Sequence, residues 1–120
     1  MAAPNLVNVA TIIGKTAGQS VGTSATAIVT NAASSGKVFK VNTLILANIL
    51  GTTAASVTVD VFKNNTTSFK IANTVVVPPD ATLILISKDN PIYLEENDSI
   101  RCLAAATSTV QAICSYEEIS

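Results

Sequence analysis

The sequence predicts an all-β protein, an antiparallel two-sheet β-sandwich that is jelly-roll-like or immunoglobulin-like, with about eight strands. Three observations support this prediction. The composition is 48% hydrophobic but only 4% aromatic and 12% charged, and β-branched and small residues fill the difference. Short apolar runs recur at regular spacing between turn signals. No stretch has the period of a convincing helix.

The domain organisation is simple. At 120 residues the chain is long enough to bury one hydrophobic core. We expect residues 1–15 to form an extended arm, on a sheet edge or on a neighbouring subunit, or a first strand, and residues 16–120 to form one sandwich domain. The start of the chain lacks the pattern of a secretory signal, and no apolar run is long enough to span a membrane. We therefore expect cytoplasmic synthesis and no membrane contact.

The first half of the chain predicts two strands after a loop or weak edge strand over residues 16–25. One strand covers residues 26–31, and the longest covers residues 37–49 after a turn. Strict alternation places Phe39 and Ile45 on one face of this long strand and Leu44 and Leu46 on the other. Because its second half is apolar on both faces, we expect a subunit contact there.

A hairpin is predicted over residues 56–77. Val57 and Val61 point inward and Asp60 outward in its first strand, and Phe69 and Val77 share one face of the second. Opposed residues of an antiparallel pair lie on the same face, so an odd loop of about three or five residues must join the two valine faces. We expect such a loop within residues 63–67, with an asparagine in the left-handed conformation.

The tract Val75 to Leu103 predicts three strands and two turns beyond a Pro78-Pro79-Asp80 corner. In its first strand, residues 82–87, Leu83 and Leu85 share one face and Ile84 and Ile86 the other. Apolar on both faces, this strand should be central or lie at an interface. The remaining elements, in order, are a turn at 88–91, a strand at 92–94, an acidic turn at 95–98, and strands at 99–105 and 110–116.

The sequence argues against an enzyme. It contains no histidine, so the usual general base and the familiar nucleophile pairs are absent. We expect the carboxylates to lie mostly in turns or on exposed faces, where solvation keeps them ionised and inert; they are Asp60, Asp80, Asp89, Glu95, Glu96, Asp98, Glu117 and Glu118. No cofactor is indicated.

Binding sites for ions and nucleic acids are not indicated either. Asp89, Glu95, Glu96 and Asp98 could offer oxygens to calcium, but their spacing matches no calcium loop, and we expect Asp98 to accept backbone amides within its own turn. The seven basic residues are scattered, which argues against nucleic-acid binding. The few aromatic residues, Tyr93 and Tyr116 among them, suit packing better than sugar binding.

The two cysteines have two readings. With a three-residue loop at 107–109, Cys102 and Cys114 would lie opposite each other on paired strands, where a disulfide is conceivable. Cytoplasmic synthesis instead favours free, buried thiols, which we prefer. Two cysteines without histidine do not complete a zinc site.

The second half of the chain carries a recognisable pattern. The tract VVVPPDATLILISKDNPIYLEENDSIRC and the ending CSYEEIS resemble small virion proteins of tailed bacteriophages, notably phages of marine bacteria and cyanobacteria, with a VPPxxxLxxxxKDxPIYLxExDxIRxxA pattern before a SYEEIS or SYEDIS terminus. Asn97 stands where a small residue such as glycine is common. The matching positions are Pro78, Pro79, Leu83, Lys88, Asp89, Pro91, Ile92, Tyr93, Leu94, Glu96, Asp98, Ile100, Arg101, Ser115, Tyr116, Glu117, Ile119 and Ser120.

The resemblance implies a structural, non-catalytic role in the virion. We expect a capsid decoration or cement protein that acts as a homo-oligomer, with a trimer favoured, bound to the major capsid protein or another virion protein. A tail, neck or fibre protein and a host-surface glycan-binding module are the alternatives. The expected contact residues are Leu6, Val7, Val9, Ile12, Ile13, Leu44, Leu46, Ile84, Ile86, Tyr116 and Ile119. We also expect the terminal SYEEIS to be docked on the sheet or across an interface.

Overall fold

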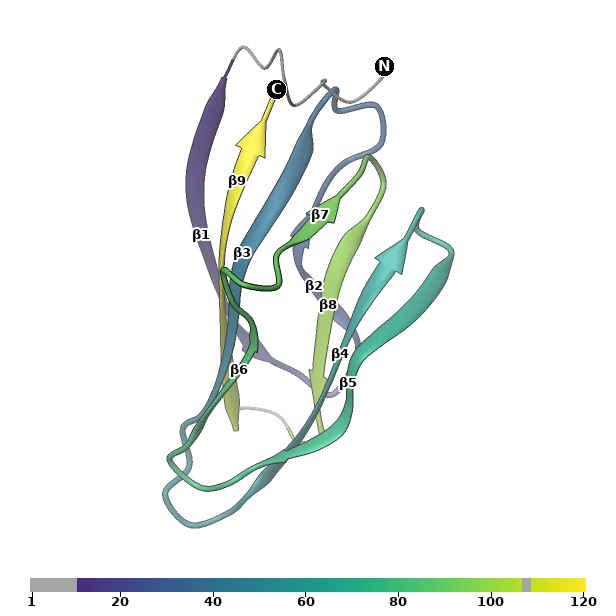
Figure 1. The fold of residues 1–120 in the computed structure, drawn as a ribbon. Coiled ribbons are helices and arrows are strands. Elements are labelled where there is room, and N and C mark those ends of the chain that lie inside the picture. The colour runs from purple at the N-terminus through teal and green to yellow at the C-terminus, as the bar shows by residue number, and fades with distance from the viewer. Residues whose placement is uncertain (1–10, 107–108) are drawn as a thin grey trace.

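The described part of the computed structural model, residues 11–106 and 109–120, consists of nine strands in two antiparallel sheets (Figure 1). This confirms the all-β sandwich prediction. No helix that could cross a membrane occurs in these ranges. The strands are β1 (Ile12–Val21), β2 (Thr26–Thr30), β3 (Val38–Asn48), β4 (Ala55–Lys63), β5 (Thr67–Val77), β6 (Thr82–Ile86), β7 (Ile92–Leu94), β8 (Ser99–Ala104) and β9 (Val110–Ile119).

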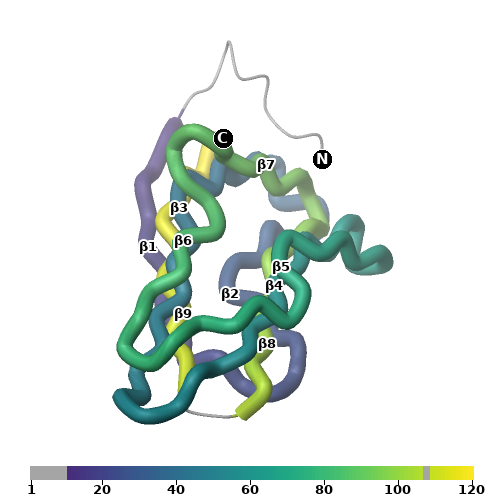
Figure 2. The backbone as a smooth tube through the Cα atoms, turned by 60° about the horizontal axis from the view of Figure 1, so that its bottom comes forward, coloured from purple at the N-terminus to yellow at the C-terminus, as the bar shows by residue number. Residues whose placement is uncertain are grey.

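The two sheets face each other across the core, as the view along the sandwich shows (Figure 2). One has the strand order β1-β9-β3-β6, with the short β7 also paired to β3, and the other has the order β2-β8-β4-β5. The C-terminal strand β9 lies between β1 and β3 and continues to Ile119, beyond its predicted end. This confirms that the terminal SYEEIS is docked, on its own sheet.

The N-terminal region differs from the prediction of a loop over residues 16–25. Residues 16–21, expected as a loop or weak edge strand, belong to β1, which pairs with β9 over its whole length. Small residues suffice there because β1 is paired on one side and much of it is exposed. Residues 1–10, most of the expected arm, lie outside the described residues.

The β4–β5 hairpin has the predicted odd loop. Lys63 pairs with Thr67, which leaves three loop residues, and Asn64 and Asn65 both have positive φ, at 52° and 54°. The predicted inward face is correct for Val57 and Val77, which are buried. Phe69 stays exposed although it pairs with the inward-facing Val61, because β5 ends the strand order of its sheet.

Bulges correct two predicted faces. In β3 the register against β9 shifts at Asn42, so the inward side changes parity from Phe39 and Val41 to Leu44 and Leu46. Beyond this shift, Leu44 and Leu46 fill the core, whereas Ile45 and Ala47 lie on the outward side of the strand.

The second bulge lies in β6, where Leu44 pairs with Ile86 and Ile45 with Ile84, leaving Leu85 as the extra residue. The prediction that Ile84 and Ile86 share a face is therefore wrong, and Ile84 points outward while Ile86 is buried. The expectation of a central strand is also wrong, because β6 ends the strand order of its sheet.

Two buried asparagines tie loops to the sandwich. The Asn31 amide nitrogen donates to the carbonyl oxygens of Lys37 and Leu94 at 2.9 and 3.0 Å. Asn48, at the end of β3, donates to the Val77 carbonyl at 3.0 Å and accepts from the Leu50 amide at 3.0 Å. Since buried polar groups need such partners, these residues fix the loops at both ends of β3.

Candidate functional site

The structure separates the expected contact residues into exposed and buried groups. Ile12 and Ile13 at the start of β1 are exposed, and Ile84 on β6 is 63% exposed. These three side chains remain available to a partner. Leu6, Val7 and Val9 lie outside the described residues.

The other expected contact residues are used by the chain itself. Leu44, Leu46 and Ile86 belong to the hydrophobic core, and Ile119 is buried. Tyr116 is half-buried and its ring lies 5.3 Å, centroid to centroid, from that of Phe39. The apolar pattern of these residues is therefore explained by packing within one chain.

The outward-pointing residues of β1, β9, β3, β6 and β7 form a surface that we call the isoleucine face. Its centre is a row of register partners that crosses four strands, from Gly18 to Ile113, Ile45 and Ile84. Among the described residues of this face the charged ones are Lys40 and Glu117, which are also register partners. The face is thus apolar at its centre and has no net formal charge.

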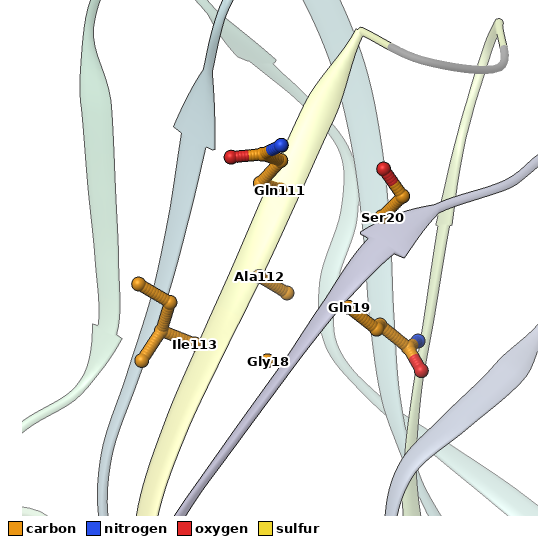
Figure 3. A pocket seen from close by; sticks show the side chains of 6 residues that line it. All are labelled: Gly18, Gln19, Ser20, Gln111, Ala112 and Ile113. Atoms are coloured by element: carbon orange, nitrogen blue, oxygen red, sulfur yellow. The ribbon is translucent and has the colours of Figure 1, made fainter.

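A hollow of about 260 Å³ opens on this face, beside Gly18 (Figure 3). Its walls come from β1 and β9 and include Ser20, Gln111 and Ile113. The hollow exists because Gly18 has no side chain, and a Cβ built there would meet nothing closer than the Ala112 carbonyl oxygen at 3.7 Å. There is therefore room on β1 for a side chain from another molecule.

The outward-pointing residues of β2, β8, β4 and β5 form the ion-pair face. Arg101 on β8 donates two hydrogen bonds to Asp60 on β4, from Nε to Oδ1 at 3.0 Å and from Nη2 to Oδ2 at 2.6 Å. Ser68 also donates to Asp60. The Arg101 guanidinium lies 3.7 Å above the centroid of the Phe62 ring, a cation–π contact.

Asp60 is 4% exposed, so the prediction that it points into solvent is wrong. It does lie on the outward side of β4, but the neighbouring side chains cover it. Burial alone would raise the pKa of Asp60, but the hydrogen bonds from Arg101 and Ser68 outweigh it and hold the pKa below the ordinary value. The carboxylate is therefore charged and fully engaged within the chain.

Glu118 on β9 is a second buried carboxylate that was expected to be exposed. Its carboxylate oxygens form ion pairs with the Nζ atoms of Lys15 on β1 at 2.9 Å and of Lys37 at 3.1 Å. The hydrogen bond from Lys15 is the main cause that lowers the pKa of Glu118, against an opposing effect of burial. These ion pairs link the first and last strands to the start of β3.

The acidic turn has the chemistry expected for Asp98. Its Oδ2 accepts the Glu95 amide at 3.0 Å within the turn, which confirms that prediction. The same side chain also accepts the Asn64 amide at 2.8 Å and the Lys63 ammonium at 2.6 Å. Asp98 is buried, contrary to the exposure expected for it, and it ties the β4–β5 loop to the β7–β8 turn.

The two cysteines do not lie opposite each other on paired strands, so the condition for the disulfide alternative is not met. Cys102 lies on β8 in one sheet and Cys114 on β9 in the other, and both thiols are free and buried. Burial is the largest cause that raises the pKa of each thiol to about 12. Both residues therefore act as small core hydrophobes, as the preferred reading expected.

Sequence reasoning missed the ion pairs and the glycine hollow. Asp60 interrupts a valine-rich strand, which was a usable signal that its charge must be satisfied nearby. The choice of Arg101 as its partner depends on the strand order, which alternation alone does not give. The three isoleucines of one row come from different strands and share no local motif.

Comparison with known proteins gives a fold similarity. No protein-family model matches the chain, and no curated protein matches it. Among solved structures, a pilus protein of Bacillus endospore appendages, from a study of disulfide-linked pili, has a TM-score of 0.52 and 16% identity, over 90% of this chain and 87% of the other. At this identity the similarity concerns the fold.

A pentameric capsid protein from metagenomic phage sequences, solved in two structures, is a weaker match. Each structure has a TM-score of 0.39 and 17% identity over 96% of this chain. The chain spans 64% and 63% of those proteins' length. These TM-scores are too low to establish a common fold.

Proposed function

We propose that this chain is a bacteriophage virion structural protein, which decorates or cements the assembled shell as a symmetric homo-oligomer. The main support is the isoleucine face, a broad sheet surface whose central apolar side chains have no covering element among the described residues. An apolar patch of this kind is typical of a protein–protein contact.

The arrangement of the charged groups supports a mechanical role over a catalytic one. Asp60, Asp98 and Glu118 are each held by a basic side chain and are used for architecture. A buried carboxylate that is already engaged by basic side chains in this way is not free to act as a general acid or base. This use of the carboxylates supports a role in which the protein acts through its surfaces.

The sequence resemblance to small virion proteins supplies the setting. On that basis the partner is the major capsid protein or another virion protein, the location is the virion, and a trimer is the oligomer favoured by the sequence. The pilus protein of similar fold is a component of a surface appendage, which agrees with a structural use of such a sandwich.

Copy number in purified particles tests this proposal. A decoration protein should be present at a copy number comparable with that of the shell subunits, measured by quantitative mass spectrometry. Particles lacking it should lose resistance to heat and osmotic shock.

Other results would assign a different role. A copy number of a few to a few dozen per particle would assign the protein to the neck, tail or fibre and would overturn the decoration role. Binding of the isolated protein to host glycans, with unchanged particle stability in its absence, would favour a host-surface module.

A further inference from the structure

The isoleucine face is complementary to itself. Two of its rows begin with a glycine on β1 and end with a large side chain at the opposite edge of the sheet. The first row runs from Gly18 through Ile113 and Ile45 to Ile84, and the second runs from Gly14 through Glu117 and Lys40 to Tyr93. Each row therefore has a gap at one edge and a projection at the other.

We infer that a second copy of the chain packs on this face, related by a two-fold axis that runs parallel to the strands between β9 and β3. Such a rotation reverses the strand order in the facing copy, so that β1 meets β6 and β7, and β9 meets β3. This rests on the self-association in the proposed function and deepens it by naming the surface.

The reversal brings each projection to a gap. Ile84, which is 63% exposed, enters the hollow of about 260 Å³ at Gly18 of the facing copy. Tyr93, also exposed, lies over Gly14, where a Cβ would have nothing within 4 Å. The two-fold axis repeats each contact, so the pair contains two contacts between Ile84 and Gly18 and two between Tyr93 and Gly14.

The middle of the rows matches as well. Ile113 of one copy meets Ile45 of the other, which covers apolar area with apolar area. Glu117 meets Lys40, so each copy supplies one charge of either sign to two intermolecular pairs. A surface that opposes unlike charges on self-contact favours that contact and disfavours others.

The size of the face is suitable for a dimer contact of modest strength. Three strands of about ten residues, β1, β9 and β3, and the shorter β6 and β7 beside β3 form this face. With a strand spacing of about 4.8 Å and a rise of roughly 3.3 Å per residue, they give on the order of 600 Å² per copy. A typical stable interface uses about 800 Å² per partner. Aligned packing of twisted sheets, about 10 Å apart, is a common geometry for such faces. The contact makes a two-fold pair, in place of the trimer that the sequence favoured.

A mixing experiment with charge reversals tests this contact. Glu117→Lys alone gives a facing pair of like charges, and so does Lys40→Glu alone. When the two variants are mixed, every intermolecular pair is again of opposite sign, whereas the neighbours within each chain are unchanged. We expect each variant alone to dimerise at least about tenfold more weakly than wild type, and the equimolar mixture to recover dimers, in sedimentation equilibrium.

A second pair of variants tests the same contact without changing Glu117 or Lys40. Ile84→Asp should remove dimers, whereas Val76→Asp, equally exposed at 63% but on the ion-pair face, should not. Circular dichroism and thermal unfolding show whether both variants are folded. If wild type forms oligomers that Ile84→Asp and the charge reversals leave intact, the isoleucine face is not the contact, although self-association stands.

A wild-type protein that is monomeric up to millimolar concentration would overturn the inferred pair. The virion role would then be judged separately by the copy number in particles. The two proposals can therefore fail independently.

Discussion

The two outer faces of the sandwich differ in whether their central side chains find partners within one chain. On the ion-pair face, Asp60, Arg101 and Phe62 satisfy one another within a single chain. On the isoleucine face, Ile84 and Ile113 remain exposed, and a hollow beside Gly18 stays open. The buried charges of the ion-pair face are satisfied within the monomer, whereas the proposed contact would supply the partners of the isoleucine face from a second copy. Substitutions should therefore affect stability on the first face and association on the second.

The strongest contrast should occur within one strand. Ile86→Asp places a charge in the core and should lower the free energy of unfolding by more than about 4 kcal/mol, which is enough to unfold a small domain. Ile84→Asp, two positions earlier, should change it by less than about 0.5 kcal/mol in the monomer. Urea unfolding of both variants at a low protein concentration measures this. Similar losses would show that the bulge at Leu85 does not separate the two side chains.

The ion-pair face should show the next largest effect. Arg101→Ala leaves the Asp60 carboxylate buried without its main partner and should cost about 3 kcal/mol of stability. Lys40→Ala on the isoleucine face is the matched control and should cost less than about 0.5 kcal/mol. Equal effects in urea unfolding would remove the distinction between the faces. The loss of stability in Arg101→Lys should lie between these two values, because lysine keeps the positive charge but cannot form both hydrogen bonds to Asp60.

Acid should weaken the monomer through its paired carboxylates. The pKa values of Asp60 and Glu118 are lower in the folded chain than their ordinary values of 3.8 and 4.5. Their stabilising effect is therefore complete above those ordinary values and is lost as the pH falls through the lower folded values. Thermal unfolding should show a decline in stability below about pH 4.5. The Asp60 share of this decline should disappear in Arg101→Ala, and an unchanged acid profile would contradict the ion-pair account.

The smallest effect is expected for the two cysteine thiols in the core between the faces. Because Cys102 and Cys114 have pKa values raised to about 12, both thiols should resist alkylation in the folded protein at pH 8. Mass spectrometry after brief treatment with a maleimide should find neither cysteine modified, and both should react in denaturant. Rapid labelling of the native protein would show that the core opens easily.

The sequence predicted the local parts of this structure well. Alternation required the odd loop between β4 and β5, and the prolines and Asn97 marked real turns. These features depend on residues close in the chain. The bulge at Leu85 was not predictable, because it depends on the register against β3 and changes which isoleucine points outward. For the same reason the sequence did not show that Arg101 reaches Asp60.

The candidate surface was predicted in part. The sequence selected Ile84 as a contact residue, and it is exposed, but it selected Leu44 and Leu46 on the same reasoning, and these fill the core. The low charge of the composition predicts a surface that is made of small residues such as Thr, Ser, Asn and Ala or is covered by a partner. Which residues form one row across four strands follows only from the strand order and register.

Cross-linking between introduced cysteines tests the central claim most directly, because the two native thiols are buried. Gly18→Cys and Ile84→Cys variants, mixed and treated with a short bis-maleimide, should give a cross-linked dimer that contains one copy of each. The same treatment of Gly18→Cys with Val76→Cys should give little product. Equal yields from both mixtures, or no product from the first, would contradict the pairing of isoleucine faces.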